Sequence, residues 1–156
     1  MFEYRAKILH IVDGDTARID VDLGFGIVYA NQSVRFFGID TPESRTKDLT
    51  EKWYGKLASN FVSDHLKVGE TYKMKTTIDK GKFGRILGEF FVKGFKEDLD
   101  PFGHKVQEEF SLNQRMVDLG YAVAYFGQSK DDIQEQHLNN RVILANRGLH
   151  PDQYMV

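Results

Sequence analysis

Five stretches of the chain show strand-like alternation or short apolar runs bounded by turn residues. Residues 2–8 alternate Phe, Tyr, Ala and Ile with charged residues, which is the two-residue period of a strand that buries one face. Residues 17–22 and the apolar run 34–39 flank glycines and predict a long antiparallel hairpin. Residues 71–78 and 85–92 predict two more strands, separated by a charged turn. The pattern therefore predicts five strands.

Three other stretches have the apolar spacing of helices. One covers residues 53–66 and lies between the third and fourth predicted strands, with a glycine soon after it as a stop. A second follows Ser111, which forms a capping-box pattern with Gln114, and ends near Gly120. A third covers about residues 131–148. The chain is therefore expected to contain about three helices.

Five strands with one helix between the third and fourth predict an α+β fold, a five-stranded OB-type β-barrel with about three helices. We expect a single domain over residues 1–156. Residues 95–109 follow Gly94, contain a glycine, a proline and several acidic residues, and predict an irregular acidic excursion between the barrel and the last helices. Barrels of this type often bind nucleic acids, but a fold alone does not establish a function.

The composition is that of an ordinary soluble domain, with 41% hydrophobic and 28% charged residues in 156. Apolar stretches such as residues 121–126 are far shorter than the roughly 20 residues of a membrane helix, so no membrane partner is expected. No signal-peptide pattern follows Met1. We therefore expect an intracellular protein, with a processed secreted form as the alternative. Nothing in the sequence indicates an oligomeric state.

The absence of cysteine narrows the chemistry of any site. Disulfides, thiolate zinc sites and cysteine nucleophiles are excluded, and only oxygen and imidazole ligands remain, which favours hard cations. The net charge of −2 argues against binding nucleic acid by bulk electrostatics. Residues 1–94 carry 15 Lys and Arg against 13 Asp and Glu, whereas residues 95–156 carry 6 against 10. The N-terminal part is therefore expected to face phosphate.

The first candidate site is the sequence Asp13-Gly14-Asp15, at a junction between two predicted strands. The glycine allows a turn close enough to aim one carboxylate inward, which makes Asp15 a candidate metal ligand. A solvated turn, with Asp13 capping its own backbone, is the more common outcome for such a segment.

The second candidate site is Asp40-Thr41-Pro42-Glu43, directly after an apolar run. Pro42 fixes its own φ and biases Thr41 towards extended backbone, so this stiff corner can hold Asp40, the Thr41 carbonyl and Glu43 around one point. A hard cation prefers such oxygens. The alternative, to which we give equal weight, is that this segment begins a helix, with its acidic residues near the positive end of the helix dipole.

Two arginines are candidate phosphate ligands. Arg35 lies within the apolar run before Asp40, and Arg85 follows a glycine in a charged turn. A guanidinium can bind phosphate with a forked geometry that lysine cannot match. The alternatives are a solvent-facing strand arginine for Arg35 and a charged hairpin turn for Arg85.

Taken together, these motifs resemble those of the staphylococcal nuclease, or thermonuclease, family. The resemblance covers nearly the whole chain, and three ordered motifs keep all their charged residues. The similar segments are Val12-Asp13-Gly14-Asp15-Thr16, Arg35-Phe36-Phe37-Gly38-Ile39-Asp40-Thr41-Pro42-Glu43, Lys82-Phe83-Gly84-Arg85, Asn113 to Gly120, Ala122-Val123-Ala124-Tyr125 and Glu135-Gln136-His137-Leu138.

The resemblance implies a single nuclease-like domain with calcium-dependent endonuclease activity. Its substrates would be single- or double-stranded DNA and/or RNA, cleaved to leave 3′-phosphate ends. The family's calcium ligands fall on Asp15, Asp40 and the Thr41 carbonyl, with Glu43 beside the metal-bound water. We expect Asp15, Asp40 and Glu43 to converge on one cation (Ca²⁺).

The resemblance also assigns residues to the substrate. Arg35 and Arg85 match the family's phosphate-binding arginines and, with Glu43, form the expected catalytic set. Lys82 and Tyr125 match substrate-binding positions, although Tyr125 could equally be a core or rim aromatic. DNA is not distinguished from RNA, because no residue is identifiable as a reader of the ribose 2′ hydroxyl.

Two positions depart from the family pattern. Phe83 and Gly127 stand where tyrosines are expected, which weakens the expectation of tight nucleotide binding. The five histidines are widely separated, and we expect His137 to serve packing and hydrogen bonding.

A noncatalytic OB-type module that binds nucleic acid or protein is the main alternative, although it would have little need for three acids. The third hypothesis is a structural interaction domain that binds calcium incidentally.

Overall fold

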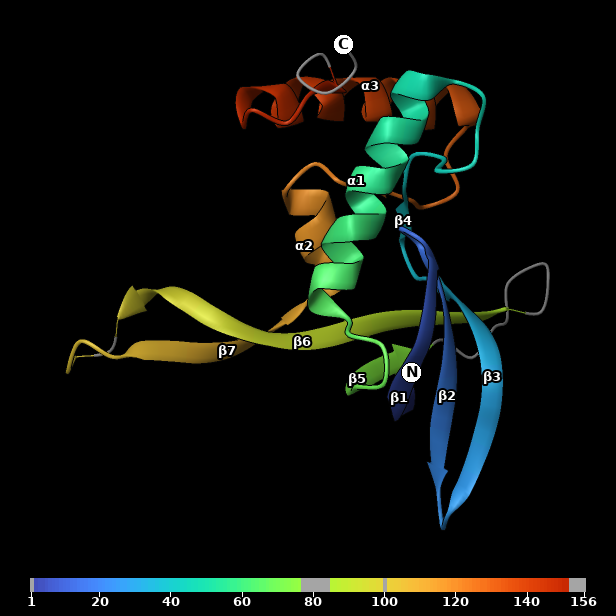
Figure 1. The fold of residues 1–156 in the computed structure, drawn as a ribbon, viewed down its shortest axis with the longest axis vertical. Coiled ribbons are helices and arrows are strands. Elements are labelled where there is room, and N and C mark those ends of the chain that lie inside the picture. The colour runs from blue at the N-terminus through green and yellow to red at the C-terminus, as the bar shows by residue number, and fades with distance from the viewer. Residues whose placement is uncertain (1, 77–84, 100, 152–156) are drawn as a thin grey trace.

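The structure is a computed structural model that describes residues 2–76, 85–99 and 101–151 (Figure 1). It is an α+β protein, with four strands before the first helix and three more between the first and second helices. In chain order, these elements are β1 (Phe2–Asp13), β2 (Thr16–Gly24), β3 (Ile27–Phe36), β4 (Ile39–Asp40), α1 (Leu49–His65), β5 (Thr71–Thr76), β6 (Ile86–Leu99), β7 (Lys105–Ser111), α2 (Leu112–Asp118), β8 (Val123–Ala124) and α3 (Lys130–Asn146). No helix in the described ranges is long and apolar enough to cross a membrane.

Five strands close into the predicted OB-type barrel. They hydrogen-bond in the order β3-β2-β1-β5-β6, and a parallel pairing of β3 with β6 closes the ring. In that pairing Val34 lies opposite Ile86, and Phe36 lies opposite Gly88. The five-stranded barrel and its three helices confirm the fold predicted from the alternation of apolar residues.

The barrel interior is built from the apolar set of each strand. Ala6 and Ile8 of β1 are fully buried, while Lys7 between them is exposed. Phe36 and Phe90 meet across the closure with ring centroids 5.0 Å apart. This closure fixes the end of β3, from which Arg35 projects.

The three predicted helices are confirmed, and each has an identifiable N-cap. Asp48 accepts from the backbone nitrogens of Thr50 and Glu51, so α1 begins a few residues earlier than its apolar spacing indicates. Ser111 caps α2 by accepting from the Gln114 backbone nitrogen. The Gln114 side chain instead donates to Asp118 one turn further on, so the capping box is only half formed.

The prediction of an irregular excursion over residues 95–109 is wrong. β6 continues to Leu99 and β7 begins at Lys105. The two strands pair antiparallel from Phe91 opposite Ser111 to Leu99 opposite Lys105, with an irregularity in the register between Phe95 and Leu99. The glycine and proline belong to the turn, where Gly103 has a φ of 80°. Pairing between the two strands therefore overrides the polar composition, and the hairpin extends away from the barrel in Figure 1.

A second, two-stranded sheet brings the C-terminal region to the end of β3. After Phe36 the chain turns at Gly38, with a φ of 76°, and enters β4, so the alternation of β3 does not continue into Asp40. β4 pairs antiparallel with β8, with Asp40 opposite Val123. Residues far apart in the sequence therefore meet beside Asp40.

Candidate active site

Asp15 is buried at the junction of β1 and β2, with only 8% of its surface exposed. Its carboxylate accepts from the Thr41 backbone nitrogen (3.2 Å) and from the Thr16 hydroxyl (3.1 Å). Its own carbonyl accepts from the Phe36 backbone nitrogen at 2.8 Å. These bonds aim the carboxylate inward and disfavour the alternative of a solvated turn for this residue.

Gly14 allows this turn to lie close to its neighbours. A Cβ at this position would lie 2.9 Å from the Ala58 Cβ of α1 and 3.1 Å from the Thr41 Cγ2. Any side chain would therefore push the turn away from α1 and from the segment that carries Asp40. Asp13, the other acid of the motif, instead accepts a short hydrogen bond from the Ser44 hydroxyl.

The segment after β4 carries Thr41 and Glu43 into the same region. Thr41 is buried, whereas Glu43 is exposed. Helix α1 supports this segment from behind, because a Cβ at Gly55 would lie 2.5 Å from the Glu43 carbonyl oxygen. The position of Glu43 therefore depends on the absence of a side chain at Gly55, a feature that the sequence patterns did not indicate.

Arg35 joins the two candidate metal ligands. One terminal guanidinium nitrogen forms a short ion pair with Asp15 Oδ2, and the other lies 3.2 Å from Asp40 Oδ1. Burial lowers the pKa of Arg35, but the ion pairs with Asp15 and then Asp40 outweigh it and hold the pKa above the usual arginine value. Arg35 therefore stays charged, and the carboxylates of Asp15 and Asp40 lie within reach of one guanidinium.

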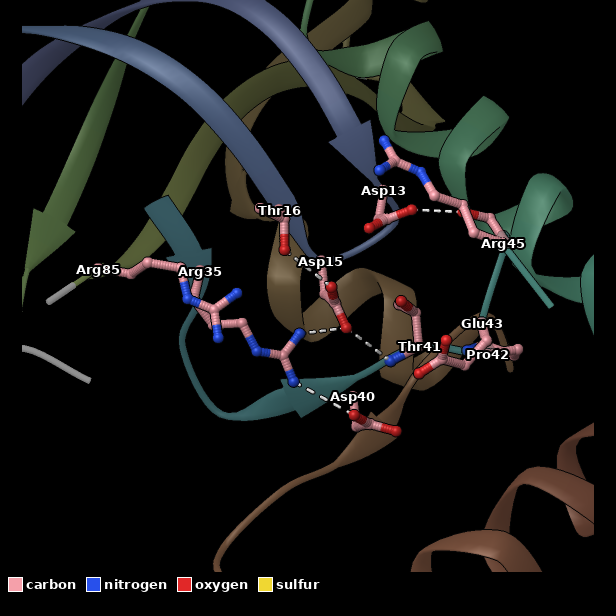
Figure 2. Close-up of a pocket in the computed structure, with 11 residues that line it drawn as sticks. Asp13, Asp15, Thr16, Arg35, Asp40, Thr41, Pro42, Glu43, Arg45 and Arg85 are labelled. Carbon is pink, nitrogen blue, oxygen red and sulfur yellow. Dashed lines mark hydrogen bonds and ion pairs between the residues drawn. The ribbon is translucent and has the colours of Figure 1, made fainter. Parts of the chain in front are cut away.

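One cavity of about 290 Å³ collects the predicted catalytic and metal-binding residues that the structure describes. In Figure 2, Arg85 reaches from the start of β6 towards Arg35, while the acidic residues lie on the other side of the Arg35 guanidinium. The predicted residues that line the cavity are Asp15, Arg35, Asp40, Thr41, Glu43 and Arg85. Lys82 and Phe83 lie outside the described residues.

The donor set suits a hard cation. Within the described ranges, no three His, Cys, Asp or Glu side chains are grouped so that they could hold a metal by themselves. The expected set needs only two carboxylates, from Asp15 and Asp40, together with the Thr41 carbonyl. Both carboxylates already contact one positive group, the Arg35 guanidinium, so their placement is compatible with a shared cation.

His137 contacts Asp40 from helix α3. Its Nε2 lies 2.7 Å from Asp40 Oδ2, and the imidazole side chain is 6% exposed. Packing and hydrogen bonding were expected for this histidine, and both are confirmed. Its partner was not predicted, because 97 residues separate the two in the sequence and no local motif links them.

Asn113 is a buried residue that ties the barrel to the turn after Arg35. Its side-chain oxygen accepts from the Phe90 backbone nitrogen, and its amide nitrogen donates to the carbonyls of Phe37 and Gly88. These three bonds satisfy a buried amide and hold the Phe37 segment against β6. In the sequence, this role could have been suspected only from the position of Asn113, a polar residue near the start of the helix predicted after Ser111.

An apolar pocket of about 390 Å³ adjoins the acidic cavity and shares Arg35 with it. Phe37, Leu87, Tyr125 and Phe126 contribute to its walls. Tyr125 is 47% exposed, and its backbone nitrogen donates to the Gly38 carbonyl at 2.8 Å, which holds the aromatic pair beside β4. Tyr125 is therefore a rim residue and not a core residue.

Comparison with known proteins identifies related sequences. The family model for staphylococcal nuclease homologues matches residues 33–147. The thermonucleases of Staphylococcus hyicus and Staphylococcus intermedius are 32% and 35% identical over 85 and 80 residues, which cover 54% and 51% of this chain and 47% and 44% of those proteins. The SPbeta prophage-derived endonuclease YokF of Bacillus subtilis (strain 168) is 28% identical over 150 residues, 91% of this chain and 44% of YokF. The chain thus spans about half the length of these relatives.

Proposed function

Because the chain belongs to the staphylococcal nuclease family, we propose that it is an endonuclease that hydrolyses phosphodiester bonds in DNA, RNA or both. The observation that carries the proposal is the position of Arg35, which contacts Asp15 and Asp40 in a cavity also lined by Glu43 and Arg85. Acids that can hold a cation and arginines that can bind phosphate thus occur side by side.

In this proposal Asp15, Asp40 and the Thr41 carbonyl hold a calcium ion. When bound, calcium would supply positive charge to the phosphate and lower the pKa of bound water. Asp15 is well suited to hold a ligand position, because the Thr41 backbone nitrogen and the Thr16 hydroxyl fix its carboxylate before any ion arrives. The buried turn at Gly14 keeps that carboxylate from moving outwards.

Arg35 and Arg85 bind the phosphate and stabilise the negative charge that accumulates as the phosphorus becomes five-coordinate. A guanidinium has five N–H donors, and the contacts with Asp15 and Asp40 involve only its two terminal nitrogens. Arg35 can therefore hold the acids and still donate to a phosphate. Arg85, on the opposite side of the guanidinium from the acids, adds a second positive charge.

Glu43 orients or deprotonates the attacking water. Its exposed carboxylate lies in the same cavity, and its backbone is held against Gly55 of α1. A general base needs access to water, and Glu43 presents an exposed carboxylate from a backbone segment that lies close against α1. Cleavage of the bond between phosphorus and the 5′ oxygen would leave 3′-phosphate ends.

The apolar pocket beside Arg35 would receive a nucleotide base or sugar. Tyr125 and Phe126 present exposed aromatic surface there, and stacking on aromatic rings tolerates every base. This arrangement supports binding without sequence preference. Lys82 remains a proposed contact to a terminal phosphate.

The proposal is tested by cleavage of labelled single-stranded DNA, duplex DNA and RNA, with calcium and then with a chelator. We expect cleavage that is lost on chelation, is restored by calcium and leaves 3′-phosphate ends. An Asp15→Asn/Asp40→Asn double variant, purified in parallel, controls for contaminating nucleases and should be inactive. Binding of these substrates without any cleavage would instead favour the noncatalytic OB-type module.

A further inference from the structure

Helix α3 buries only two side chains along its length, and one of them contacts the active-site acid. Lys130 to Asn146 is fully described, and its buried residues are His137 and Leu144. Leu144 joins the hydrophobic core, whereas His137 places Nε2 against Asp40 Oδ2 at 2.7 Å. A helix with so little buried apolar surface therefore uses a polar side chain for one of its two main anchors.

The position of His137 is fixed from both sides. Gln136 accepts from the Gln128 side chain at 2.9 Å, and Asn140 donates to the Ala122 carbonyl at 2.9 Å. Both partners flank β8, which pairs with β4 and hence with Asp40. Helix α3 is thus hydrogen-bonded, next to His137, to residues on both sides of the strand that pairs with Asp40.

The geometry also shows which nitrogen carries the hydrogen. Asp40 Oδ1 accepts from Arg35, and Oδ2, the other carboxylate oxygen, is the acceptor in the contact with His137. His137 Nε2 must therefore donate. Nδ1 is buried and finds no partner among the described residues, so the contact with Asp40 is the one hydrogen bond of the ring there.

We infer that His137 is a positioning residue for Asp40, which fixes the carboxylate rotamer that binds calcium. The inference rests on the proposed function, in which Asp40 is a calcium ligand. Arg35 holds Oδ1 and His137 holds Oδ2, so the carboxylate is clamped between β3 and α3. Hydrogen bonds to a metal ligand from outside the coordination sphere orient that ligand, and their loss typically costs 10- to 100-fold in metal affinity.

The test compares two amides that differ only in reach. In His137→Gln the side-chain nitrogen takes roughly the place of Nε2 and can still donate to Asp40. In His137→Asn it takes the place of Nδ1, too short to reach. We expect calcium affinity, measured by titration calorimetry without substrate, to stay within about threefold of wild type for Gln and to fall about tenfold or more for Asn.

Leu144→Ala is the matched control, because it removes the other buried side chain of α3 without touching Asp40. We expect a lower unfolding temperature and an unchanged calcium affinity. Equal affinities for the Gln and Asn variants would overturn the positioning role alone, as would a loss in Leu144→Ala as large as that in His137→Asn. A wild-type protein that binds no calcium would overturn the proposed function and this inference with it.

Discussion

Glu43 is far more exposed than Asp15, so a substitution at Glu43 can change catalysis with little effect on folding. Asp15 is buried and hydrogen-bonded, whereas Glu43 is exposed. Replacing Glu43 by Gln keeps the volume but removes a proton acceptor and a negative charge. We expect an unchanged fold and a cleavage rate lower by roughly 10² to 10⁴. Single-turnover cleavage and thermal unfolding of the same preparation measure the two effects.

A calcium titration of the Glu43→Gln variant completes this experiment. Its calcium affinity should fall less than that of Asp15→Asn or Asp40→Asn, because Glu43 is proposed to act through a bound water. Near-normal cleavage by a folded, calcium-bound Gln variant would rule out an essential role for this carboxylate.

The two arginines offer a test of geometry at constant charge. Arg35→Lys and Arg85→Lys each keep the positive charge but lose the planar fork, which we expect to lower the rate on the order of tenfold or more. The loss should be seen in kcat/KM for a short oligonucleotide. Arg35→Lys should also weaken the joint contact with Asp15 and Asp40, since one ammonium cannot reproduce two terminal nitrogens held in a plane.

The proposal that Arg35 and Arg85 both bind the phosphate is tested by comparing the two lysine variants. If both lysine variants cleave at the wild-type rate with subsaturating substrate, the arginines do not act by forked hydrogen bonding. A loss of cleavage rate in Arg35→Lys alone would show that Arg85 does not bind the phosphate by forked hydrogen bonding.

At the scale of elements, Gly55 couples helix α1 to the active-site segment. By helix propensity alone, Gly55→Ala would stabilise α1 by about 1 kcal/mol. The new Cβ, however, would lie 2.5 Å from the Glu43 carbonyl oxygen, and that neighbour is backbone and not a flexible side chain. We expect the overlap to dominate, with a net destabilisation of about 1–3 kcal/mol and a lower cleavage rate as Glu43 is displaced.

Lys56→Ala is the control for this substitution. Lys56 is the exposed neighbour of Gly55 on the same helix, so its replacement changes helix propensity without approaching Glu43. We expect wild-type cleavage and almost unchanged denaturant unfolding. A Gly55→Ala variant that is more stable than wild type and fully active would show that the segment can shift without consequence.

The parts of the fold that were predicted correctly depend on local signals. The barrel strands and the three helices follow from periodicity and caps, such as Ser111 before α2. The β6–β7 hairpin was missed because its stability comes from pairing between strands, to which turn-like composition is a poor guide. The contacts of His137 with Asp40 and of Gly55 with Glu43 join distant segments, so only the folded chain reveals them.

At the scale of the whole molecule, charge is divided between the barrel and the later part of the chain. Residues 1–94 carry a small excess of Lys and Arg, 15 against 13 acids, and include both arginines of the site. Residues 95–156 carry 6 against 10 acids. Glu97, Asp98 and Asp100 belong to this acidic part of the sequence, and negative charge there can weaken the attraction of a polynucleotide without taking part in the chemistry.

Neutralising this acidic region should therefore strengthen nucleic-acid binding without changing catalysis. The triple variant Glu97→Gln/Asp98→Asn/Asp100→Asn removes three negative charges and keeps the length of the hairpin, which a deletion of residues 96–104 would not. We expect a severalfold higher affinity for single-stranded DNA at about 0.01 M salt, where the Debye length is roughly 30 Å, and no difference at about 1 M, where it is roughly 3 Å. Fluorescence anisotropy with a labelled oligonucleotide and a chelator measures binding, and cleavage of a dinucleotide provides the control, since it should not change. An affinity equal to that of the wild type at every ionic strength would remove the electrostatic role, because charges that act through space must show their effect where screening is weakest.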